Sequence, residues 1–334
     1  MWSFLKRDKR FWFGLLFLVS IVLASIGNTI WNNGEIRRVS ILYDYDGKGG
    51  VLAAPFPPSW QFWLGTDRKG YDLLHLIVEG GKWTIGIALL IALLRVLFGI
   101  LFGVLLGTYV KRGFAKIEAF FDSFTVIPMV MIAYFMLRSA IVFGNGEMTS
   151  SFYERASFEV ILLTVLAVPT LAIYVANEVR KLFTEEFIDA ARILGGSKRH
   201  IVFKHIFPHL YTSFVIVFIQ QFVQTLIILL HLGMLGLFFG GTIVFYGEDI
   251  DSVTHEWSGL IGAYFRSLTV HPWIPLVPIM FFGLTIFSGN IMVLSIQQAM
   301  AKARLGEGVK TEKIEETKSL SQPKEDLFTF KHTI

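Results

Sequence analysis

The chain has 334 residues, of which 54% are hydrophobic, and its formal net charge is only +4. Such an apolar composition excludes an ordinary soluble domain and indicates an all-α, polytopic membrane protein. The absence of cysteine excludes disulfides, thiol catalysis and cysteine-based metal sites. No basic run is interleaved with aromatic residues, so we do not expect nucleic-acid binding.

Residues 1–31 are predicted to form a cytoplasmic N-terminus and a first transmembrane helix. Residues 11–31 carry no charge and are long enough to cross a bilayer. This uncharged stretch exceeds the apolar core of a cleaved signal peptide, so we expect an uncleaved span. By the positive-inside rule, the N-terminus is placed in the cytoplasm by the basic cluster Lys6, Arg7, Lys9 and Arg10.

Residues 32–82 are expected to form an extracytoplasmic segment rich in turn residues. Within it, Gly65 and Gly70 supply turns, and Asp67 and Asp72 are suited to capping local helices. The residues leave two alternatives open, a structural loop and a loop that contacts a solute directly.

Residues 83–301 are expected to form the core, with five more spans. The second span is predicted at residues 83–110. A small-residue stripe for close helix packing is formed there by Gly99, Gly103 and Gly107. Arg95 lies mid-span, where a charge is costly. It either faces a translocation path or pairs structurally with a carboxylate or carbonyl of a neighbouring subunit.

The remaining spans are predicted from apolar stretches at residues 119–143, 158–177, 211–231 and 272–297. Pro128 is expected to kink the third span, and Arg138 to snorkel towards the headgroups at its outer end. A broken or re-entrant segment is expected after the fifth span. Within that span, Gln220, Gln221 and Gln224 either line a path or form hydrogen bonds to neighbouring helices.

Six spans with both termini in the cytoplasm follow from this pattern and the basic inner loops. The tail at residues 302–334 is polar and charged, and we expect a flexible cytoplasmic segment, either without secondary structure or with one short helix.

The charged loop 184–210 lies between two apolar segments and is predicted to hold two short helices. The first begins at a Thr184 cap and ends at Gly195, because glycine accommodates a left-handed conformation. The second begins at Ser197 and ends before Pro208. The apolar face of the first helix consists of Phe187, Ala190, Ala191 and Leu194.

This loop resembles the EAA loop of ABC-importer permeases. The resemblance lies in Asp189-Ala190-Ala191, in Gly195 and in Ile206-Phe207-Pro208, with Asp189 in place of Glu and Phe207 in place of Leu. In that superfamily the loop docks on a cytoplasmic ATPase, which implies a coupling loop at residues 184–208. The implied coupling residues are Glu186, Asp189, Ala190, Ala191, Gly195, Ile206 and Pro208.

Residues 63–74, WLGTDRKGYDLL, resemble a segment of the dipeptide, oligopeptide and nickel permeases, except that Tyr71 replaces the usual Arg. The resemblance covers residues 64–297, but the family's Gly-Asp-x-Leu-Arg-Asp motif does not follow Asn290. It implies the type I ABC importer permease fold, in a second, C-type permease subunit of a bacterial or archaeal cytoplasmic membrane.

Gly81-Lys82 is followed by Trp83 and does not form a Walker A motif, so we expect no ATP hydrolysis by this chain. The resemblance implies ATP and Mg on partner ATPases, and neither a cofactor nor a metal on this chain. The implied partners are a second permease, two ATP-binding subunits, an extracytoplasmic solute-binding protein and membrane lipid.

The expected substrate is a peptide, and a nickel chelate or another small solute is the alternative. The candidate path residues are Arg95, Gln220, Gln221 and Gln224. Two other classes remain to be distinguished: a non-transporting or regulatory homologue, and a membrane-embedded enzyme. The enzyme is disfavoured because H-E-x-x-H and G-x-S-x-G motifs are absent.

Overall fold

The computed structural model describes residues 2–43, 50–144, 150–245 and 250–320, and the side chains of residues 2, 3, 43 and 304–320 are not described. Within these ranges, five helices are long and apolar enough to cross a membrane, at Lys9–Asn32 (α2), Leu73–Tyr109 (α3), Phe152–Leu182 (α6), Lys198–Met234 and Trp273–Ala303. Two further helices, α4 (Phe114–Phe124) and α5 (Met129–Ile141), form a sixth candidate span with a 68° bend. The predicted all-α membrane fold is confirmed.

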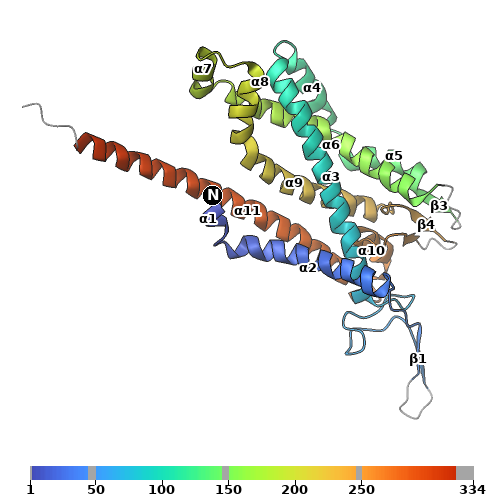
Figure 1. The fold of residues 1–334 in the computed structure, drawn as a ribbon. Coiled ribbons are helices and arrows are strands. Elements are labelled where there is room, and N and C mark those ends of the chain that lie inside the picture. The colour runs from blue at the N-terminus through green and yellow to red at the C-terminus, as the bar shows by residue number, and fades with distance from the viewer. Residues whose placement is uncertain (1, 44–49, 145–149, 246–249, 321–334) are drawn as a thin grey trace, which may run out of the picture.

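The glycine stripe lies where α3 packs along α6 (Figure 1). A Cβ atom on Gly103 would lie 2.6 Å from the Cβ of Val175, and one on Gly99 would lie 2.6 Å from Leu171 Cγ. A Cβ on Gly107 would be 2.8 Å from the carbonyl oxygen of Ala176. Three successive turns of α3 therefore need glycine, which confirms the predicted close packing.

α3 begins at Leu73, well before the expected start of the second span at residue 83. Asp72 caps it by accepting a hydrogen bond from Leu74 N at 2.9 Å. Glu79 and Lys82 fall within the predicted outer segment, but the two form an ion pair inside the helix. Mutual neutralisation allows both to lie in α3.

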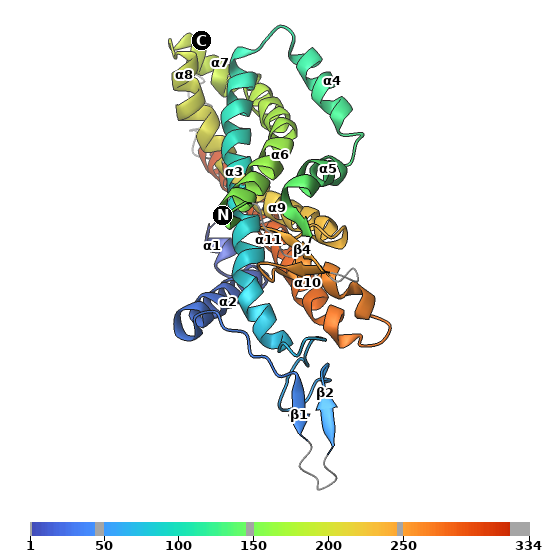
Figure 2. The ribbon, with the colours of Figure 1, turned by 90° about the vertical axis from the view of Figure 1, so that its right-hand side faces the viewer.

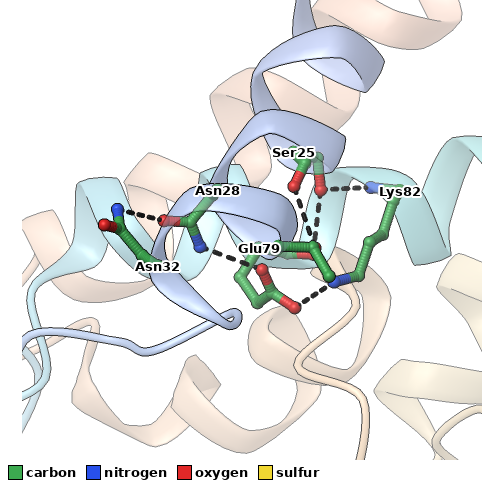
Figure 3. A network of polar contacts seen from close by, with 6 residues as sticks. Ser25, Asn28, Asn32, Glu79 and Lys82 are labelled. Atoms are coloured by element: carbon green, nitrogen blue, oxygen red, sulfur yellow. Dashed lines mark hydrogen bonds and ion pairs between the residues drawn. The ribbon is translucent and has the colours of Figure 1, made fainter.

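This ion pair belongs to a polar network that joins α2 to α3 (Figure 3). Asn28 Nδ2 donates to Glu79 Oε2 at 3.0 Å, and Ser25 Oγ donates to the Glu79 carbonyl at 3.2 Å. Lys82 N in turn donates to Ser25 Oγ at 3.1 Å. The first span is thereby fixed to the core by hydrogen bonds as well as by apolar packing.

The third span is broken where a kink was expected. α4 ends at Phe124 and α5 begins at Met129, directly after Pro128. Proline lacks the N–H that a continuous helix needs and disfavours helical geometry at the preceding residue, Ile127. Figure 2 shows α4 turned away from α3 and α6.

The charged loop folds into α7 (Glu186–Ile193), α8 (Lys198–Ile201) and a π-helical turn (Val202–Ile206), followed by α9 (Phe207–Met234). The predicted Thr184 cap was wrong: Glu185 occupies the N-cap position, and the Thr184 hydroxyl donates to the Lys181 carbonyl. The predicted end before Pro208 was also wrong. The wider π turn accommodates the missing N–H and the ring of this proline, so the helix continues into the membrane span.

Short strands, which we had not expected, lie towards the opposite end of the molecule. The hairpin of β1 (Ile41–Tyr43) and β2 (Val51–Ala53) projects away from the helices (Figure 2). A mixed sheet consists of β3 (Val142–Gly144), β4 (Thr242–Val244) and β5 (Ile250–Ser252). The buried helix α10 (Trp257–Tyr264) and a 3₁₀ turn (Phe265–Ser267) follow, in the region expected to be broken or re-entrant.

Both ends of the chain contain helical structure beyond the predicted spans. A short helix, α1 (Trp2–Leu5), packs on the last helix, α11 (Trp273–Leu320). The first part of the predicted flexible tail, to Leu320, therefore continues α11. The rest of the tail, residues 321–334, lies outside the described residues.

Candidate functional site

A cavity of about 700 Å³ lies between the bent pair α4–α5 and the helices α6 and α9. The structure brings all the predicted path residues to its wall, namely Arg95, Gln220, Gln221 and Gln224. Gln220 and Gln224 are exposed, and Gln221 is half-buried. Most of the remaining wall is apolar or aromatic and includes Phe120, Phe124, Pro128, Met129 and Pro169. The cavity thus offers a few amide groups on an otherwise apolar surface.

Arg95 is only 1% exposed and its guanidinium is fixed by its own chain. Nε and Nη2 donate to the Leu163 carbonyl at 3.0 and 2.7 Å, and Nη1 donates to Thr225 Oγ1 at 3.0 Å. Thr225 Oγ1 donates in turn to the Gln221 carbonyl at 2.7 Å. These contacts favour the structural alternative, with a carbonyl of α6 rather than of a neighbouring subunit as the partner. The path role of Arg95 stays a prediction.

The predicted coupling loop, residues 184–208, lies at the end of the molecule opposite the β1–β2 hairpin (Figure 1) and carries exposed apolar residues. Ile188 is fully buried in a cluster with Val179, Leu182, Ile201 and Val202. The opposite side of α7 is open, with Ile193 86% and Leu194 87% exposed. We define the α7 knob as Phe187, Ala190, Ile193 and Leu194, all of which are exposed. Ile188 therefore anchors α7 to the core, and the opposite side of the helix carries the exposed apolar knob.

The predicted coupling residues divide into exposed and buried members. The exposed ones are Glu186, Asp189, Ala190, Gly195 and Pro208. Ala191 is half-buried and Ile206 is buried. Ile206 therefore lies in the core that supports the loop. Its burial argues against a place on a docking surface.

Backbone geometry explains the turn after α7. Gly195 has φ of +83°, a conformation that favours glycine, as predicted. The N–H of Gly196 donates to the Ala191 carbonyl at 3.0 Å. Ser197 then caps α8 by accepting from His200 N at 3.3 Å. On α7 itself, Arg192 forms an ion pair with Asp189 at 2.6 Å, so the carboxylate in the Glu position of the EAA pattern is already paired.

The segment containing Asp67 is held against α10. The Asp67 carboxylate is 1% exposed; Oδ1 accepts from the N–H groups of Lys69 and Tyr71, and Oδ2 accepts from Tyr264 Oη at 2.8 Å. Burial raises the pKa of the Asp67 carboxyl and raises the pKa of Tyr264 well above its ordinary value. Because both Asp67 and Asp72 are engaged within the chain, these contacts favour the structural loop.

Two buried carboxylates near this end were missed in the sequence. Glu256 Oε1 accepts from Phe239 N at 3.0 Å, and Glu159 Oε2 accepts from Gly240 N at 3.3 Å. Arg155 Nε donates to the Gly240 carbonyl at 2.7 Å. Glu159 was the one sequence signal for this buried group, because a carboxylate inside a predicted span is unusual. The group holds the connection between α9 and β4 against α6.

The spanning helices, the cavity between them and the anchored loop between spans define an integral membrane protein of the permease class. The chain belongs to the family described as binding-protein-dependent transport system inner membrane component, whose model matches residues 99–305. It is thus the permease component of an ABC importer.

Two relatives are similar over most of their length. The oligopeptide transport system permease protein OppC of Bacillus subtilis is 23% identical over 295 residues, which cover 88% of this chain and 86% of the relative. The glutathione transport system permease protein GsiD of Shigella dysenteriae is 23% identical over 243 residues, which cover 73% of each chain.

Proposed function

We propose that this chain is one of two permease subunits of an ATP-driven importer of peptides. The names of the relatives, which refer to oligopeptides and glutathione, support a peptide substrate. The basic loops support an orientation with both termini and the coupling loop in the cytoplasm, in a bacterial or archaeal membrane. The β1–β2 hairpin then lies outside, where a solute-binding protein delivers its cargo.

The observation that carries this proposal is the α7 knob. An apolar patch on a solvent-facing surface is unfavourable unless a partner covers it, so it marks a protein contact. Residues 184–208 form the coupling loop, and the knob inserts into a groove of a cytoplasmic ATPase. The ATPase subunits bind ATP and Mg and hydrolyse the nucleotide, and this chain contributes no nucleotide site.

The knob is connected to the cavity through packed helices. α7 is anchored through Ile188, and the helix at Lys198–Met234 begins beside it and carries Gln220 and Gln224 into the cavity. Closure of the ATPases displaces α7 and tilts this helix, which exposes the cavity alternately to each side. The coupling force is the difference between the ATPase contacts made in the two states.

The glutamines suit a peptide because each amide both donates and accepts hydrogen bonds, as a peptide backbone does. Gln220 and Gln224 are the exposed members and form the path surface. Arg95 holds α3, α6 and α9 in register behind them. The second permease closes the open side of the cavity.

The test is uptake of labelled trialanine by proteoliposomes that contain the complete complex and its binding protein. We expect uptake that requires ATP and that falls at least fivefold in a Gln220→Leu/Gln224→Leu variant. The matched control is Phe135→Leu, an exposed apolar position on α5 that does not line the cavity. ATP-dependent uptake of a nickel chelate without trialanine would contradict the substrate, and absence of any ATP-dependent uptake would contradict transport.

A further inference from the structure

Arg95 is a buried cation at the wall of the cavity between α4–α5, α6 and α9, and its hydrogen bonds do not neutralise it. Its acceptors, the Leu163 carbonyl and Thr225 Oγ1, are both uncharged. The ion pairs found among the described residues all join other side chains. A guanidinium stays protonated at neutral pH, so these hydrogen bonds stabilise the charge without cancelling it. The wall therefore contains an uncompensated positive charge.

The rest of the wall adds no opposing charge. Of the described residues that line the cavity, Arg95 is the only charged one, and the others are apolar, aromatic or neutral polar. The carboxylates of Asp122 on α4 and Glu178 on α6 lie on helices that contribute to the cavity, but neither residue is part of its wall. The lining as a whole is therefore positive.

We propose that the charge of Arg95 makes this path select anionic peptides over cationic ones. The inference rests on the proposed import of peptides through this cavity and deepens it by naming the charge class of the solute. Arg95 is only 1% exposed, so it acts through its electric field rather than by direct contact. A charge in a wall of low dielectric acts strongly on charges inside a cavity, and a cleft of one sign concentrates solutes of the opposite sign.

Charge selection and hydrogen bonding to the peptide come from different residues. Gln220 and Gln224 are exposed on the same wall and offer neutral donors and acceptors. Arg95 is fixed to their helix, α9, through Thr225, whose hydroxyl donates to the Gln221 carbonyl at 2.7 Å. Loss of the charge therefore leaves the amide groups of the path in place, and a substitution at Arg95 separates the two contributions.

The experiment measures ATP-dependent uptake of three tripeptides by proteoliposomes that contain the complete complex and its binding protein. The peptides are alanyl-glutamyl-alanine, alanyl-glutaminyl-alanine and alanyl-lysyl-alanine, which differ in net charge but keep the same termini. The readout is the ratio of uptake of the glutamyl peptide to uptake of the lysyl peptide. Because the binding protein is the same in every sample, its own preference cancels when a variant is compared with the parent.

We expect Arg95→Met to lower this ratio about tenfold, because the field of the wall is lost. Arg95→Lys keeps the charge but not the planar fork, so total uptake is expected to fall while the ratio stays within about twofold of the parent. The matched control is Arg112→Met, which removes one exposed charge outside the cavity and is expected to leave the ratio unchanged. An equal fall for all three peptides in Arg95→Met would show a purely structural role and would overturn the proposal.

A Gln224→Glu variant tests the same claim with Arg95 intact, including the case in which Arg95→Met does not assemble. The substitution is nearly isosteric, lies at an exposed position of the wall and places a carboxylate there that opposes Arg95. We expect the ratio to fall about tenfold, and an unchanged ratio would overturn charge selection. Absence of ATP-dependent uptake of alanyl-glutaminyl-alanine by the parent would instead contradict the proposed function.

Discussion

Arg95 shows how a single residue acquires a different interpretation in three dimensions. A charge in a predicted span suggests either a path or a structural pair. The structure resolves its contacts: the guanidinium joins the Leu163 carbonyl of α6 to Thr225 of α9. A carbonyl is not visible as a partner in a sequence, because every residue carries one. Only the spatial neighbours distinguish the two alternatives.

Glu256 leads to a prediction about pH. It is buried and outside the spanning helices, and burial raises the pKa of its carboxyl. The folded chain therefore binds this proton more tightly than the unfolded chain, so the contribution of Glu256 to stability falls as pH rises above the ordinary carboxyl pKa of about 4.3.

We expect Glu256→Gln, which resembles the protonated side chain, to flatten the fall of the unfolding midpoint as pH rises above about 4.3. The matched control is Glu35→Gln, at an exposed position. His255 has the opposite influence, because burial lowers its pKa and favours the folded chain as pH rises. The difference between variant and parent isolates Glu256, and identical slopes in both would contradict its raised pKa.

At the scale of elements, the sequence predicted the spans because an uncharged apolar stretch of about 20 residues is typical of a membrane-spanning helix. It failed at helix ends where polar groups are satisfied within the protein. Glu79 and Lys82 neutralise each other inside α3, so the helix begins before the predicted span. Pro208 fits within a helix because a π turn precedes it, and nothing in the local sequence signals that turn.

The glycine stripe gives a matched test of helix packing. Gly103→Ala is expected to lower the free energy of unfolding by about 1–3 kcal/mol, because the added Cβ meets Val175 Cβ and the Ala172 carbonyl oxygen at 2.6 and 2.7 Å. Gly86→Ala lies on the same helix with no atom within 4 Å of the added Cβ and is expected to be neutral or stabilising. Thermal unfolding in detergent measures both, and equal effects would contradict the tight contact between α3 and α6.

At the scale of the whole molecule, two sites are connected. The cavity contains the predicted path residues, and α7, which carries the knob, packs through Ile188 beside the start of the helix that lines that cavity. The sequence indicated the path residues from their polarity within predicted spans, and Phe187, Ala190 and Leu194 of the knob from helical spacing, but it did not indicate Ile193. It could not indicate that Ile193 and Leu194 would be the most exposed members of the knob, because helical spacing alone does not say which face of α7 packs on the core.

The most direct test of the central claim is recovery of the ATPase with the tagged full chain, quantified by mass spectrometry after gentle detergent purification. We predict that a P-loop ATPase and a second permease co-purify, and that Ile193→Asp/Leu194→Asp lowers ATPase recovery at least tenfold while the second permease is retained. Lys111→Asp/Arg112→Asp, which adds two carboxylates at another exposed loop, is expected to retain both partners. Full ATPase recovery with the knob variant, or no ATPase with the parent chain, would contradict coupling through α7.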